Sequence, residues 1–220
     1  MFAVWRAGWD DERANARVLY KSVSDIEAVE ESGIMKIEYL GHACFLIDES
    51  LVIDPYKDGS VPGLEPLRVS AVKAICSHEH ADHSGVECVE LVPGECEFGI
   101  VEVPSFHDDQ QGVLRGPNTI FVINSRETGE KLVHLGDLGH FPDDSQLAAI
   151  SDADYLLIPV GGFYTIDAAT AVKICEAARP KCIIPMHYRT DVSGYPEIAT
   201  VDEFLRLAKE KGIIEKVKMM

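Results

Sequence analysis

The stretch CSHEHADHSG, residues 76–85, places three histidines and one aspartate within six positions. Imidazole and carboxylate groups are the side chains that bind zinc and neighbouring first-row metals. A histidine-rich surface loop is the competing interpretation of this stretch. A metal site would need further ligands elsewhere in the chain to complement the four side chains of this cluster, His78, His80, Asp82 and His83.

Three more candidate ligands each follow a predicted strand. His107 follows VEVPSF, Asp137 follows KLVHLG and His187 follows KCIIPM, as the cluster itself follows AVKAIC. Strand ends at one edge of a sandwich converge in space, whereas residues within a strand point to opposite faces. A lone histidine or aspartate at such a position is also often a turn or capping residue. Seven converging side chains exceed the needs of one tetrahedral zinc, but they suit two metals that share a bridging ligand.

The elements that would position these side chains are short strands and a few helices. Apolar and β-branched runs predict strands at 33–40, 44–48, 51–55, 71–76, 96–106, 118–125, 131–137, 154–160 and 181–187, with a weaker candidate at 213–220. Helical periodicity predicts helices at about 82–91, 143–150, 167–178 and 201–211. The order indicates a protein of the α/β (α+β) class, built as a sandwich of two mixed sheets with helices outside.

Composition limits the possible functions. A length of 220 residues and a hydrophobic fraction of 46% indicate one folded domain, expected over residues 35–220. Residues 1–34 form a polar N-terminal extension, either a helix or the product of an upstream start. The net charge of −17 disfavours nucleic acids and anionic membranes as partners. Charges near the N-terminus argue against a signal peptide, and six cysteines without a CxxC pair suit a reducing cytoplasm.

SHEHADH resembles the HxHxDH motif of the metallo-β-lactamase superfamily. SFHDD, HLGDLGH and PMHY resemble the further ligand positions of that superfamily in the same order, and the likeness runs from about Met35 to Thr190. It implies a four-layer αββα sandwich of two mixed β-sheets with external helices. YLGHACFLI, LVIDPY, RGPNTIFVI and IPVGGFYTIDA look most like single-domain metal-dependent hydrolases related to L-ascorbate-phosphate lactonase.

The resemblance also implies a dinuclear metal centre. The ions would be Zn²⁺ first, with Mn²⁺, Fe²⁺ or Ni²⁺ as alternatives. A metal-bound hydroxide would attack an ester, lactone or phosphodiester bond, and Asp82 could orient that hydroxide as a catalytic residue. The implied ligands are His78, His80 and His107 for the first metal, Asp82, His83 and His187 for the second, and Asp137 as the bridge.

Three other side chains could support the ligands. Asp54, at the end of LVID, could accept the second N–H of a metal-bound histidine, or it could cap the turn before Pro55. The family likeness places His42 near the pocket. His134 lies within its strand, which favours a core or supporting role over metal binding.

Three further side chains could meet the substrate. His140 lies past the turn after Asp137 and could contact the substrate or only line the rim. Arg189 could bind a carboxylate or phosphate, or be solvated. Thr165, like Asp167, could cap the following helix, or help that helix start to hold an anion. Two divalent ions, two aspartates and one hydroxide sum to about +1, so the centre could attract a small anion.

The leading hypothesis is therefore a hydrolase of a small anionic molecule, with no nucleic acid or membrane as partner. The chain has no inserted domain or basic patch of the kind that nucleases of this superfamily carry, and about 30 residues after His187 leave no room for the C-terminal domain of glyoxalase-type thioesterases. A non-catalytic metal-dependent binding or sensing module, or a diiron redox protein, remains the alternative. Assembly into a homo-oligomer stays open.

Overall fold

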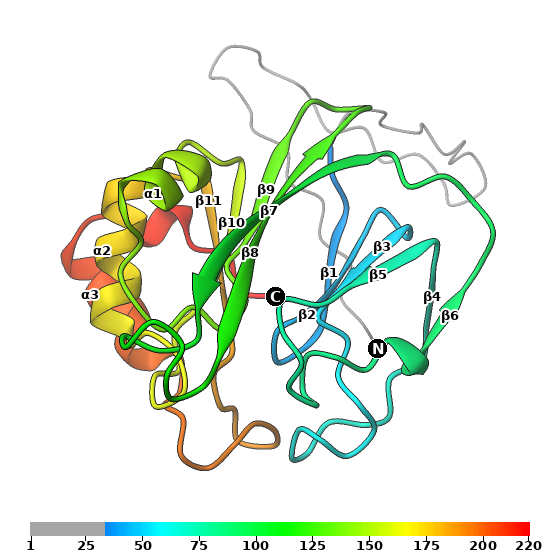
Figure 1. Ribbon diagram of the computed structural model, residues 1–220. Coiled ribbons are helices and arrows are strands. Elements are labelled where there is room, and N and C mark those ends of the chain that lie inside the picture. Colours follow the sequence, from blue (N-terminus) through cyan, green and yellow to red (C-terminus); the bar gives the residue numbers. More distant parts are fainter. Residues whose placement is uncertain (1–33) are drawn as a thin grey trace, which may run out of the picture.

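Two mixed β-sheets pack face to face in the computed structural model, which describes residues 34–220 (Figure 1). The N-terminal extension expected over residues 1–34 lies outside the described residues, apart from Ile34. The first sheet has the strand order β1-β2-β3-β5, with the strands β1 (Ile37–Gly41), β2 (Cys44–Ile47), β3 (Leu51–Ile53) and β5 (Lys73–Ile75). The second has the order β11-β10-β9-β8-β7, with β7 (Phe98–Phe106), β8 (Pro117–Ser125), β9 (Lys131–His134), β10 (Tyr155–Pro159) and β11 (Cys182–Met186).

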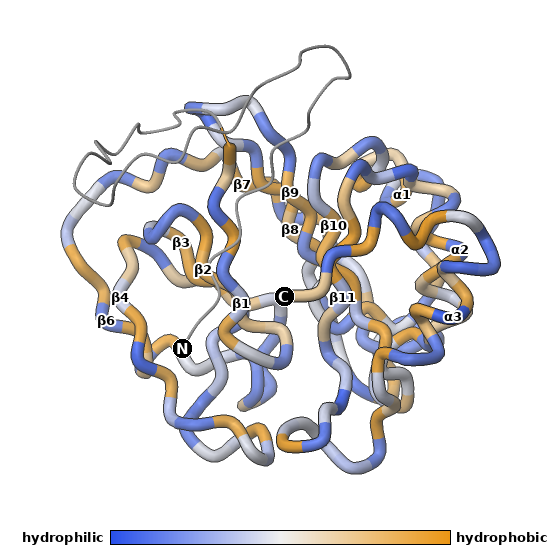
Figure 2. The backbone as a smooth tube through the Cα atoms, turned by 180° about the vertical axis from the view of Figure 1, so that it is seen from behind, coloured by the Kyte–Doolittle hydropathy of each residue, from blue (hydrophilic) through white to orange (hydrophobic). Residues whose placement is uncertain are grey.

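The alternation of side chains along each strand builds the apolar layers. In β2, Phe45 and Ile47 point into the layer between the two sheets, while Cys44 and Leu46 pack on the outer face of the first sheet. Hydrophobic segments accordingly run through both sheets (Figure 2). Because every residue of β2 is buried, the strand is apolar throughout instead of alternating with polar residues.

Three helices cover the outer face of the second sheet (Figure 1): α1 (Asp144–Ile150), α2 (Ala168–Ala178) and α3 (Asp202–Glu210). Asp167 caps α2 by accepting a hydrogen bond from the Thr170 N–H. Helix α2 ends at Ala178, and the next residue, Arg179, adopts a left-handed conformation before Pro180. No helix among residues 34–220 is long and apolar enough to cross a membrane.

The mixed two-sheet fold and the three later helices are confirmed, but two predicted elements are wrong. Residues 82–91 form a short 3₁₀ turn, η1 (Val86–Cys88), and strand β6 (Val89–Leu91), because Val89 pairs with β4 (Val69–Ala71) and is buried. The segment 213–220 contains the 3₁₀ turn η2 (Ile214–Lys216) and a single bridge to β11 instead of a strand. Within the described part of the chain, the outer layer over the first sheet is therefore β4, β6 and loops, where external helices were expected.

Strand direction brings many strand ends to common sheet edges. Strands β1, β3 and β5 run in the same direction, because β2 is antiparallel to both β1 and β3, and β5 is parallel to β3. Strands β7, β9, β10 and β11 also share one direction, because β8 is antiparallel to both β7 and β9, and β10 and β11 continue in parallel. The residues that follow these strands therefore lie at one edge of each sheet. Asp54, His107, Asp137 and His187 all occupy such positions.

Phe45 tests the layer between the sheets. Its ring is fully buried, 5.0 Å from the Tyr39 ring and 5.8 Å from the His134 ring, measured between centroids. Phe45→Ala should lower the free energy of unfolding by about 3–5 kcal/mol, because it removes buried area and leaves a cavity. Chemical denaturation measures this change. Phe141→Ala, at a side chain that is 46% exposed, should change stability by less than about 1 kcal/mol, and an equal loss in both variants would contradict the assignment of this core.

Candidate metal centre

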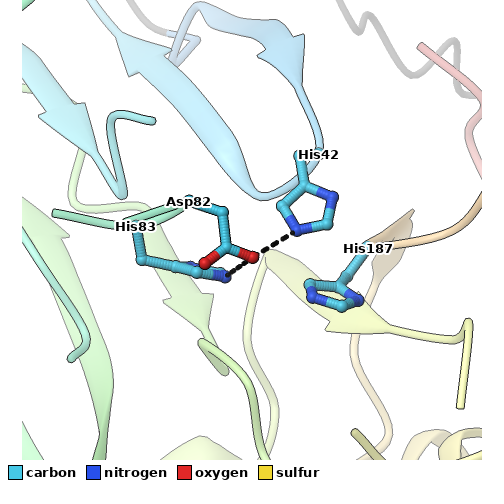
Figure 3. A group of neighbouring side chains, drawn as sticks. All are labelled: His42, Asp82, His83 and His187. Atoms are coloured by element: carbon cyan, nitrogen blue, oxygen red, sulfur yellow. Dashed lines mark hydrogen bonds and ion pairs between the residues drawn. The ribbon is translucent and has the colours of Figure 1, made fainter. Parts of the chain in front are cut away.

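The structure brings all seven candidate ligands together, and His42 joins them. The potential ligand atoms within each of three groups lie within 4.8 Å of one another. The first group comes from the loop after β5 and the end of β7. The second comes from the β1–β2 turn, the loop after β5 and the end of β11 (Figure 3), and the third shares residues with the other two. The groups are His78, His80 and His107; His42, Asp82, His83 and His187; and His78, His83 and Asp137.

Asp137 lies at the centre of the cluster. Its Oδ2 atom is 3.0 Å from His107 Nε2 and 3.1 Å from His187 Nε2, and its Oδ1 atom is 3.2 Å from His83 Nε2. Burial alone would raise the pKa of Asp137, but the charges of His187 and His83 hold it well below the usual range. The carboxylate is therefore ionised and able to bridge cations.

The cluster contains buried polar atoms that lack hydrogen-bond partners among the described residues. Three of these atoms lie where the ligands converge: His83 Nε2, His187 Nε2 and Asp137 Oδ1; the others are the Nδ1 atoms of His42, His107 and His187. The three converging atoms approach one another without hydrogen-bond geometry, and a buried polar atom left in this way costs about 1–3 kcal/mol. Atoms that converge on a metal ion have this arrangement, so the donor set fits metal binding.

Asp54 and Ser77 orient two of the histidines. Asp54 Oδ2 accepts hydrogen bonds from His83 Nδ1 at 2.9 Å and from Ser77 Oγ at 2.6 Å. Ser77 Oγ is in turn 2.9 Å from His78 Nδ1. Burial raises the pKa of Asp54, but the hydrogen bond and charge of His83 outweigh that effect and lower it. With Nδ1 held in this way, His78 and His83 both present Nε2 to the cluster.

His42 and His187 meet in an unusual backbone conformation. Both are left-handed, with φ of 57° and 52°, and the His187 N–H donates to the His42 carbonyl at 2.9 Å. Their ring centroids are 4.0 Å apart, and His42 Nε2 is 3.1 Å from Asp82 Oδ2 (Figure 3). Gly161 makes room for this pair, because a Cβ there would lie 2.2 Å from the His187 carbonyl oxygen.

Burial keeps two histidines of the cluster, His42 and His78, neutral. Burial and the neighbouring His187 lower the pKa of His42 to about 4, while burial and the charge of His83 lower the pKa of His78 to about 3. Neutral imidazole is the form that binds a metal. Both side chains are therefore ready to act as ligands at neutral pH.

His134 has a structural role, in agreement with its position within β9. Its Nε2–H donates to the Ala43 carbonyl at 2.9 Å, while Nδ1 accepts the Gly136 N–H at 3.1 Å. Gly136 has φ of 55°, and a Cβ there would lie 2.3 Å from Asn118 Oδ1, the atom that accepts the Asp137 N–H. His134 and Asn118 therefore fix the turn that presents Asp137.

Three predicted substrate residues are engaged elsewhere. Arg189 Nε donates to the Ile198 carbonyl at 3.3 Å, and the Thr165 hydroxyl donates to the Ile166 carbonyl at 3.2 Å. His140 accepts the Phe106 N–H at 3.4 Å. None of Arg189, Thr165 and His140 lines the cavity that opens beside the cluster.

That cavity has a volume of about 310 Å³ and adds side chains that the sequence analysis did not single out as site residues. These side chains are Arg115 and Tyr195. Tyr164, which the sequence offered together with Thr165 as a residue that could hold a substrate anion, also lines the cavity. A basic residue shortly after His107 in an acidic chain was the available signal for Arg115, whereas Tyr195 gave none. The complete lining is His80, Asp82, His107, Arg115, Asp137, Tyr164, His187 and Tyr195.

Asp54→Asn tests the orienting network. The substitution keeps the shape of the side chain but places one amide N–H₂ group where a carboxylate accepts hydrogen bonds, so His83 loses its fixed orientation. Metal affinity should fall about 10- to 100-fold, measured by competition with a chromogenic chelator. Asp154→Asn is the matched control. Asp154 pairs with Lys181 and accepts the Lys131 N–H, and it lies before the first residue of β10, at the opposite end of the sheet from the ligands. Unchanged affinity in Asp54→Asn would rule out this role.

Comparison with known proteins identifies the family. The sequence matches the Beta-lactamase superfamily domain over residues 36–187. A UPF0173 metal-dependent hydrolase from Carboxydothermus hydrogenoformans is 32% identical over 225 residues, covering 83% of this chain and 96% of that protein. A UPF0173 metal-dependent hydrolase from Archaeoglobus fulgidus is 28% identical, covering 84% of this chain and 96% of that protein.

Solved structures agree with this match. A Thermotoga maritima protein assigned to the zinc-dependent hydrolases of the metallo-β-lactamase superfamily has a TM-score of 0.61 and 34% identity, covering 79% of this chain and 85% of that one. Igni18, a metallo hydrolase from Ignicoccus hospitalis, has the same fold with a TM-score of 0.65 and 22% identity, covering 84% of this chain and 94% of that one. The chain, with its buried cluster of histidines and aspartates, thus belongs to the UPF0173 metal-dependent hydrolase family of the metallo-β-lactamase superfamily.

Proposed function

We propose that the protein hydrolyses an ester, lactone or phosphodiester bond in a small anionic molecule, with two divalent metal ions in its site, Zn²⁺ in first place. The observation that carries this proposal is the division of the ligands into two groups, joined through Asp137. Zinc is favoured by the histidine-rich donor set and by the assignment of the Thermotoga maritima relative. Bound ions of this kind lower the pKa of water towards ~7 and polarise a carbonyl or phosphoryl oxygen.

The ligands divide by position. Asp137, between the groups, would bridge the ions, and His42, through its contact with Asp82, would complete or support the second set. This assignment agrees with the one that the superfamily resemblance implied. The first ion would be held by His78, His80 and His107, and the second by Asp82, His83 and His187.

Asp82 has the geometry to orient the attacking water. Its side chain is 14% exposed and lines the cavity, whereas Asp137, which also lines the cavity, is almost fully buried. One carboxylate oxygen lies 3.1 Å from His42 Nε2, so His42 fixes the carboxylate while it faces the cavity. A carboxylate held in this way can accept a hydrogen bond from water and direct it towards the substrate.

The bond type is supported by resemblance and by volume. YLGHACFLI and IPVGGFYTIDA look most like the hydrolases related to L-ascorbate-phosphate lactonase, which favours a lactone or a related ester. A cavity of about 310 Å³ suits a small molecule. The six cysteines are all unpaired, which supports a cytoplasmic setting as part of this proposal.

A reconstitution experiment tests the proposal. Metal analysis of protein purified without added metal should find close to two ions per chain, and the zinc-loaded protein should hydrolyse at least one member of a panel of lactones, phosphodiesters and thioesters. Removal of metal with a chelator should abolish the rate, and zinc should restore it. A reversible redox couple without hydrolysis under any metal would instead support the diiron alternative.

Asp82→Asn separates orientation from metal binding. The amide keeps the size of the side chain but is a weaker hydrogen-bond acceptor and carries no charge. We expect kcat to fall about 100-fold or more, while most of the metal is retained because the amide oxygen can still serve the second ion beside His83 and His187. Steady-state kinetics and metal analysis on the same preparation provide the two measurements, and an unchanged kcat would end this assignment.

A further inference from the structure

Arg115 is a cation without a carboxylate partner in an acidic protein. Arg68, Arg179 and Arg206 pair with aspartate or glutamate. No carboxylate among residues 34–220 lies within ion-pair distance of Arg115, Arg126 or Arg189, but of these three arginines it is Arg115 that lines the cavity. Arg115 is half-buried and lines the cavity beside the metal cluster, which contains no lysine and no second arginine. Its charge therefore faces the space that a substrate would occupy.

The guanidinium group is held on one side only. One terminal nitrogen donates to the Phe163 carbonyl at 3.1 Å, and the group lies 5.9 Å from the centre of the Tyr164 ring. A guanidinium has five N–H donors, so this single hydrogen bond leaves others for a ligand. The ring beneath fixes the guanidinium while its remaining N–H groups stay available.

The loop that carries Arg115 is built around one buried carboxylate. Asp108, 3% exposed, accepts backbone hydrogen bonds from Gln110 and Gly112 at 2.8 and 2.9 Å, and from Leu114 and Arg115 at 2.9 and 2.8 Å. It directly follows His107, a candidate metal ligand. The position of the arginine is thus coupled to the metal cluster through a short and internally bonded segment.

A row of aromatic rings leads from Arg115 to the cluster. The Tyr164 and Tyr195 centroids are 5.8 Å apart, and Tyr195 is 5.6 Å from the ring of His42. The Tyr195 hydroxyl donates to the Ser60 carbonyl at 2.8 Å, which fixes the middle of this row. Tyr164 and Tyr195 therefore line the cavity between the guanidinium group of Arg115 and the metal cluster.

We propose that Arg115 determines substrate specificity by binding a carboxylate group of the substrate, while the scissile bond lies at the metal cluster. This inference rests on the proposed hydrolase function and narrows its substrate to a small ester or lactone that also carries a carboxylate. A carboxylate matches the single charge and the planar fork of one guanidinium. A phosphate also fits the guanidinium fork, but a phosphate monoester carries up to two negative charges at neutral pH, of which one arginine balances only one.

Dicarboxylates test the inference, because one carboxylate can bind the metals while the other reaches Arg115. Calorimetric titration of the zinc-loaded full chain with acetate, succinate, glutarate and adipate gives the preference for the best dicarboxylate over acetate. We expect a preference of about 10-fold or more in the wild type. Arg115→Gln should remove most of this preference, because it weakens dicarboxylate binding far more than acetate binding, and Arg115→Lys should retain part of it.

Arg189→Gln is the matched control, since Arg189 bonds to a backbone carbonyl away from the cavity, and it should keep the full preference. Thermal unfolding of each variant shows that it is folded. The inference is overturned if the wild type shows no preference or if Arg115→Gln retains it. Preference that depends on Arg115 in a protein that hydrolyses nothing would refute the proposed function and leave this binding site standing.

Discussion

The buried ligand atoms that face one another without hydrogen bonds are the constraint on which the rest of the structure depends. His83 Nε2, His187 Nε2 and Asp137 Oδ1 are withdrawn from water with no partner among residues 34–220. At about 1–3 kcal/mol each, they use up a large part of the 5–15 kcal/mol by which domains are stable. Apolar layers on both faces of each sheet must offset this cost, and metal binding would remove it, so folding and metal affinity are coupled.

Strand direction explains how so many ligands reach one place. Each ligand follows a strand that runs towards the same edge of its sheet, so short loops are enough to place it in the cluster. The network around Asp54 then adds orientation: the carboxylate follows β3, and its partners Ser77 and His83 follow the parallel strand β5. A single carboxylate between neighbouring parallel strands thus sets the direction of two imidazole rings.

The sequence predicted the parts of the site that depend on residue type and strand order. To predict the HxHxDH segment as a ligand site, together with His107, Asp137 and His187, it was enough to assume that each strand ends where its apolar run ends. The predicted helix at 82–91 is wrong because pairing of Val89 with β4 outweighs local periodicity, a tertiary effect that one segment does not encode. Thr165 was one of two capping candidates, and Asp167 fills that role because its side chain reaches the Thr170 N–H.

The positions of Arg115 and Tyr195 could not be predicted for a related reason. Both lie on loops without periodicity, and their approach to the cluster depends on long-range contacts. Four backbone N–H groups turn the Arg115 loop around Asp108, and the Gly194 N–H donates to the Pro62 carbonyl at 2.9 Å beside Tyr195. Such contacts join residues far apart in the chain or depend on the path of a whole loop, and no short motif records them.

The charge distribution limits which anions can use such a site. The chain carries −17 overall, so a polyanion that reached the cavity would leave its other charges against an acidic surface. Salt limits the range of this repulsion to about 8 Å at physiological ionic strength, a distance comparable with the size of a small substrate. A molecule with one or two negative groups can place one beside Arg115 and the other at the metals, with no charge left outside. With the two proposed metal ions bound, the cavity would be positively charged, and together with the acidic surface it would favour small anions.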